Sequence, residues 1–96
     1  MKVRLTRNIH HHTPETGLTY KVLFKDYELD IPPVIGATID DTAWHRNDIT
    51  KIENINIISE EADFYYVELT AKEVDDLNSI DKFVYIAKLH GWGVLY

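Results

Sequence analysis

Three consecutive histidines, His10, His11 and His12, have the clearest capacity for chemistry in this sequence. Neutral imidazole nitrogens bind zinc and nickel ions where several of them converge on one point. In an extended chain, His10 and His12 lie on one face and His11 lies on the other. His10 and His12, with His45 as a third ligand, therefore form a candidate metal site.

A solvated loop is the competing interpretation of the same stretch. Pro14 and Gly17 are typical turn residues, and they follow the histidines within "HHHTPETG". Adjacent side chains in a loop converge poorly, and their spacing matches no metal motif. We therefore predict a loop at the histidines and no cofactor, and we keep the metal-binding protein as an alternative.

A second candidate site lies in "DDTAWHRND", which reads as a polar loop around Trp44. Tryptophan and arginine are frequent in the energetically dominant positions of protein interfaces. Trp44, His45 and Arg46, with His11, are therefore candidate partner-binding residues. The alternative is that Trp44 folds back and caps the core. Calcium is disfavoured because the acidic spacing is wrong for a calcium loop and no glycine lies inside it.

Catalysis has little support in the sequence. Cysteine is absent, which removes disulfides, thiolate metal sites and cysteine nucleophiles. Ser59 and Ser79 lack the context of an activated serine, and the scattered glycines form no phosphate-binding loop. We name no catalytic residue, and the sequence favours a non-enzymatic function.

Charge is distributed unevenly along the chain. Residues 1–25 carry a net charge of +4, whereas residues 26–96 carry −10, and the whole chain carries −6. Nucleic-acid binding needs basic side chains that contact phosphates, so the acidic balance disfavours it. A weak binder that uses the basic first strands is kept as an alternative. Its candidate contacts are Lys2, Arg4, Arg7 and Lys21.

Alternating apolar and polar side chains predict strands over most of the chain. The expected strands are residues 2–7, 18–31, 49–58, 64–71 and a short one in 92–96, and 49–58 and 64–71 are expected to pair as a hairpin. We expect a tight turn near Asp26 within the second strand, and a bulge or two covered faces in the third. After Pro32 and Pro33 the chain should bend. The apolar side chains expected to point inward there are Ile31, Val34, Ile35 and Ile39.

The period changes near the C-terminal end. Ile80, Phe83, Val84 and Ala87 follow the spacing of one helix face. Asn78 or Ser79 is the expected N-cap, with His90 in the last turn and Gly91 just beyond it. Trp92, between two glycines, is expected to fill the core.

These elements predict one α+β domain spanning residues 1–96. The expected architecture is a small antiparallel sheet, or a partly open barrel, of about five strands with one C-terminal helix. No signal peptide or membrane span is recognisable, so we expect a soluble, cytoplasmic chain. Its expected function is that of a small acidic binding module that contacts another protein, in the manner of an inhibitor or immunity protein. Pairing of two copies along a strand edge is a further alternative.

Overall fold

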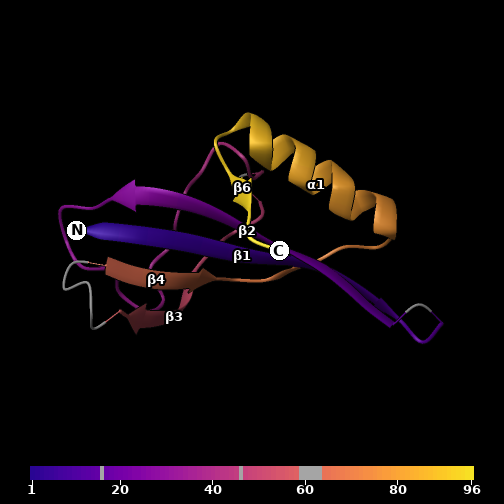
Figure 1. Ribbon diagram of the computed structural model, residues 1–96, viewed down its shortest axis with the longest axis horizontal. Coiled ribbons are helices and arrows are strands. Elements are labelled where there is room, and N and C mark those ends of the chain that lie inside the picture. Colours follow the sequence, from indigo (N-terminus) through magenta and orange to yellow (C-terminus); the bar gives the residue numbers. More distant parts are fainter. Residues whose placement is uncertain (16, 46, 59–63) are drawn as a thin grey trace.

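The computed structural model describes residues 1–15, 17–45, 47–58 and 64–96, and it is a sheet-dominated α+β fold (Figure 1). Its strands are β1 (Lys2–Thr13), β2 (Gly17–Glu28), β3 (Ile52–Ile57), β4 (Phe64–Leu69), β5 (Lys72–Glu73) and β6 (Gly93–Val94), and its helix is α1 (Leu77–Leu89). The predicted class and the C-terminal helix are confirmed. The described residues form six strands instead of about five, and these strands make one open sheet instead of the alternative, a partly open barrel. No helix among them is long and apolar enough to cross a membrane.

Strands β1 and β2 form a long hairpin at the centre of the sheet. In Figure 1 this hairpin reaches beyond the other strands. Its antiparallel register runs from Lys2 opposite Glu28 to Thr13 opposite Gly17. The three histidines therefore lie in a strand, and the predicted loop at these positions is wrong. Their partners across the hairpin, which include Tyr20 and Thr19, favour extended backbone.

The predicted turn at Asp26 is also wrong, because β2 runs through this residue without interruption. Asp26 lies opposite Arg4, whose guanidinium Nε and Nη2 donate hydrogen bonds of 2.8 and 3.1 Å to its carboxylate. A polar residue that finds a cross-strand partner does not need to leave the sheet.

The sheet is mixed, which corrects the expected antiparallel arrangement. Strand order is β3-β4-β1-β2-β6, and β5 pairs separately with β1. Both β4 and β5 run parallel to β1, whereas β3 and β4 form the predicted antiparallel hairpin. A register shift between Ile52 and Asn54 is the bulge that changes the side-chain parity of β3.

The core lies between one face of this sheet and a cover formed by α1 and the loop of residues 29–51. Val3, Leu5 and Ile9 of β1 point into it, and Trp44 of the loop and Trp92 are buried with them. The centroids of the two indole rings lie 5.0 Å apart. Both tryptophans therefore belong to the core.

The bend after the prolines is present, but most of its apolar side chains do not point inward as expected. Ile31, Val34 and Ile35 are exposed, and only Ile39 packs against the core. Residues 30–38 contain bends, a turn and an isolated bridge at Thr38 but no strand, so they lack the alternation that would turn every second side chain toward the sheet.

Helix α1 buries the predicted face, with Ile80 and Ala87 fully inside and Phe83 and Val84 partly so. Asp76 is the N-cap in place of the expected Asn78 or Ser79, and its carboxylate accepts a 2.8 Å hydrogen bond from the Ser79 backbone N–H. An aspartate satisfies the free N–H groups of the first turn and its charge suits the helix dipole there.

The helix ends at Leu89, so His90, expected in the last turn, is instead its C-cap, and Gly91 follows as predicted with φ of +90°. We expect Gly91→Ala to lower the free energy of unfolding by about 1 kcal/mol, because a Cβ disfavours left-handed backbone. Gly91→Asn should cost less, since asparagine tolerates this conformation better. Urea unfolding of the two variants tests this, and equal losses would contradict the backbone explanation.

Candidate functional site

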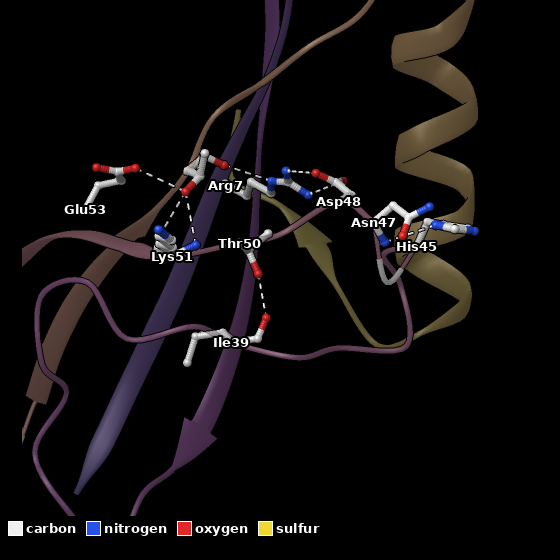
Figure 2. A network of polar contacts seen from close by, with 9 residues as sticks. Arg7, Ile39, His45, Asn47, Asp48, Thr50, Lys51 and Glu53 are labelled. Atoms are coloured by element: carbon white, nitrogen blue, oxygen red, sulfur yellow. Dashed lines mark hydrogen bonds and ion pairs between the residues drawn. The ribbon is translucent and has the colours of Figure 1, made fainter.

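The loop of residues 29–51 is fastened to the sheet by an ion pair between Arg7 and Asp48. The Arg7 side chain is only 1% exposed, and its Nη1 and Nη2 donate hydrogen bonds of 2.8 and 2.7 Å to the two Asp48 oxygens. Its Nε donates to the Thr70 carbonyl at 2.9 Å, and its guanidinium lies 4.7 Å from the centre of a Trp44 ring. Figure 2 shows the Arg7 guanidinium facing the Asp48 carboxylate. These hydrogen bonds from Arg7 lower the pKa of Asp48 against the opposing effect of burial.

A second ion pair anchors the loop at Asp41, whose side chain is only 2% exposed. Its carboxylate accepts hydrogen bonds from Lys25 Nζ at 3.0 Å, from the Tyr27 hydroxyl and from the Trp92 indole N–H at 3.2 Å. The Ala43 backbone N–H donates to the same group at 2.9 Å. Burial opposes ionisation of Asp41, but these donors outweigh it and lower the pKa of the carboxyl group. Both anchoring carboxylates are therefore held ionised and fixed, which suits a structural role.

A cavity of about 570 Å³, here called the loop cavity, is lined by residues 38–42, Trp44, His45, Asp48 and Ile49. Trp44 lines it but is only 8% exposed, whereas His45 and Asp40 are exposed at its edge. The His45 ring Nδ1 accepts the Asn47 backbone N–H at 3.1 Å (Figure 2). The predicted contact residue Arg46 lies outside the described residues. Of the three candidate partner-binding residues that the structure describes, Trp44 offers little surface, His11 lies on β1, and His45 is exposed beside this cavity.

The histidines of β1 are separated by the pleat of the strand. His11 faces the core side, where its Nδ1 donates a 2.9 Å hydrogen bond to the Val74 carbonyl, while His10 and His12 share the opposite side. His45 belongs to the loop on the covered side of the sheet. Among the described residues, no group of three histidine, cysteine, aspartate or glutamate side chains is arranged to hold a metal ion. The three proposed metal ligands are not brought together.

The basic side chains proposed for nucleic-acid contact are partly committed within the fold. Arg7 is buried against Asp48, and Arg4 is held by Asp26 and lies 4.6 Å from the Phe24 ring centre. Lys2 and Lys21 are exposed. Two of the four proposed phosphate contacts are therefore already neutralised.

The face of the sheet opposite α1 contains, besides the candidates Arg4, His10 and His12, several residues that were not among the candidates from the sequence. Even-numbered side chains of β1, β2 and β4 share this face, because the register places Arg4 beside Tyr66 and Thr6 between Phe24 and Glu68. It contains a groove of about 490 Å³, which we call the open-face groove. The residues that line it include Asn8, Leu18, Tyr20, Tyr66, Glu68 and Tyr96.

Several groove residues are apolar or aromatic and well exposed, namely Leu18, Tyr20 and Tyr96. The described elements that cover the core, α1 and the loop of residues 29–51, lie on the other face. Strand alternation along residues 18–24 predicts that Leu18, Tyr20 and Val22 share one face, so part of this surface could have been predicted from the sequence. Its extension to Tyr66 and Tyr96 depends on which strands are neighbours.

Comparisons with protein-family models, with curated proteins and with solved structures found no match to this chain.

Proposed function

We propose that this chain is a non-catalytic binding module that acts through protein–protein contact, with the open-face groove as its contact surface. The observation on which this proposal rests is that α1 and the loop of residues 29–51 cover one face of the sheet, whereas the described residues leave the other face uncovered. A hydrophobic sheet face is normally buried against another layer, and here Leu18, Tyr20 and Tyr96 remain exposed. A partner protein would supply the missing layer.

The residue types support a protein partner. Tyrosine is enriched at interfaces because it offers a large apolar ring with few rotatable bonds and a hydroxyl that accepts or donates hydrogen bonds. Tyr20, Tyr66 and Tyr96 come from β2, β4 and the segment after β6. Tyr20 and Tyr66 lie on the two strands that flank β1, and a rigid sheet presents them with little ordering cost on binding.

Charge favours a protein over a nucleic acid. Glu68 stands in the groove, and Arg4 and Arg7 are held in ion pairs within the chain. An acidic module of this kind suits the inhibitor or immunity role, in which it would cover a basic site on its target. The lack of cysteine favours a reducing compartment, and we place the module in the cytoplasm.

Site-specific photo-crosslinking in the native host tests this proposal. A photoreactive phenylalanine analogue replaces Tyr96 in the groove or Tyr85 on the outer surface of α1, and these two side chains are 69% and 66% exposed. We expect a discrete adduct with another protein from position 96 and none from position 85. Tyr20→Ala should suppress this adduct while leaving the thermal unfolding of the chain nearly unchanged.

Three results would contradict the proposal. They are equal adducts from both positions, no adduct from position 96, and an adduct that contains only two copies of this chain. The last result would indicate self-association instead of a separate partner.

A further inference from the structure

We infer that the partner places an arginine, flanked by apolar side chains, into the open-face groove beside Glu68. This inference rests on the proposed function and adds the chemistry of the partner. It depends on two polar groups of the groove that have no partner among the described residues, Glu68 and Asn8, and on the apolar and aromatic side chains around them.

Glu68 is the charged side chain among the described residues that line the groove. It is exposed, and the ion pairs formed by the described residues do not include it. Its neighbours across the two adjacent strands, Thr6 and Asn54, carry no charge. An apolar surface that closes over this carboxylate would desolvate an unpaired charge, so a fitting partner brings a cation.

Asn8 adds a second acceptor to the same groove. Its side-chain Oδ1 is buried and has no hydrogen-bond partner among the described residues. A buried acceptor without a donor destabilises the chain that holds it. Glu68 is open to an occupant directly, whereas the covered Asn8 oxygen accepts from it only when the Asn8 side chain turns toward the groove on binding, so the occupant that relieves both groups donates hydrogen bonds at more than one point.

Arginine fits this arrangement better than lysine does. A guanidinium carries five N–H donors and no acceptor, and it can bind a carboxylate with two parallel hydrogen bonds. Its flat face also stacks on aromatic rings, and the groove supplies Tyr66, two residues from Glu68 on β4, together with Tyr20.

A second copy of the chain is a poorer occupant of the groove. Two copies related by a twofold axis would bring the same acceptors, Glu68 and Asn8, to both sides of one interface. The basic residue nearest this surface in register, Arg4, is already bound to Asp26. Each copy also carries a net charge of −6. These features favour a separate basic partner.

Selection from a phage-displayed library of random dodecapeptides tests the inference. Peptides are selected on the intact chain and counter-selected on a Tyr20→Ala/Tyr96→Ala variant, so that those retained depend on the groove. We expect them to combine apolar residues with arginine. Glu68→Gln should weaken their binding about tenfold, or about 1.4 kcal/mol, because it replaces hydrogen bonds between two charged groups by weaker ones to a neutral amide.

Asp81→Asn is the matched control, because it removes one exposed negative charge from α1, outside the groove. It should leave the affinity of the selected peptides unchanged. Groove-dependent peptides that are not enriched in arginine would overturn the inference that the partner supplies an arginine. Equal weakening by Glu68→Gln and Asp81→Asn would do the same. Either result would leave the proposed function in place. A selection that yields no groove-dependent peptide would count against both.

Discussion

Arg7→Ala is expected to lower the free energy of unfolding by about 3–5 kcal/mol, the usual cost of removing one partner from a buried ion pair. The substitution leaves the Asp48 carboxylate without its two donors and the Thr70 carbonyl without its N–H donor. It also removes the guanidinium that lies against Trp44. The loss therefore combines an unpaired charge, an unsatisfied carbonyl and a cavity at the centre of the fold.

Arg4→Ala is the matched control, because Arg4 belongs to the same strand and also pairs with an aspartate. The Arg4–Asp26 pair is much more exposed than the Arg7–Asp48 pair. Surface pairs contribute at most about 1 kcal/mol, so this variant should remain close to the parent chain. Urea unfolding of both variants measures the difference. Equal losses would show that burial does not set the strength of the Arg7 contact.

The same ion pair predicts a dependence of stability on pH. Hydrogen bonds from Arg7 hold the pKa of Asp48 below its ordinary value of 3.8 in the folded chain. The stabilisation is therefore complete above pH 3.8 and is lost as the pH falls through the lowered pKa. Urea unfolding of the parent chain and of Asp48→Asn between pH 2 and pH 6 should show a smaller acid dependence in the variant.

The burial of Arg7 was accessible from the sequence, but its partner was not. Alternation along β1 places Arg7 on the side of Val3, Leu5 and Ile9, so its position in the core follows from the pattern alone. Asp48 lies 41 residues further along, in a loop that has no periodicity. A pattern of period two fixes which side of a strand a residue occupies, but it carries no information about the loop that covers that side.

The direction of neighbouring strands is likewise not determined by side-chain alternation. The pairing of β3 with β4 was predictable because a short connection forces antiparallel neighbours. The parallel pairing of β1 with β4 joins Val3 to Tyr65 across most of the chain, and either direction would have satisfied their side-chain alternation. The open-face groove was missed for this reason, since Tyr66 meets the β1–β2 hairpin only through that parallel pairing. Tyr96 is likewise placed by backbone hydrogen bonds of residues 95 and 96 to Val22.

Asp41→Ala is expected to destabilise the chain on the same scale, by about 3–5 kcal/mol, because it removes the acceptor of a buried cluster. Lys25, Tyr27 and the Trp92 indole all donate to this carboxylate, and each loses a partner in the variant. Asp41→Asn retains one oxygen acceptor and should lose less. Urea unfolding, followed by tryptophan fluorescence because Trp92 contacts the carboxylate directly, measures both variants.

Asp40→Ala separates this effect from a general loss of negative charge in the loop. Asp40 is adjacent in sequence and lines the same loop cavity, but its side chain is exposed. A substitution at such a surface position should change stability by no more than about 0.5 kcal/mol. A loss from Asp41→Ala no larger than that from Asp40→Ala would mean that the Lys25–Asp41 pair does not hold the loop against the sheet. The loop would then depend on Arg7 and Asp48 for its anchorage.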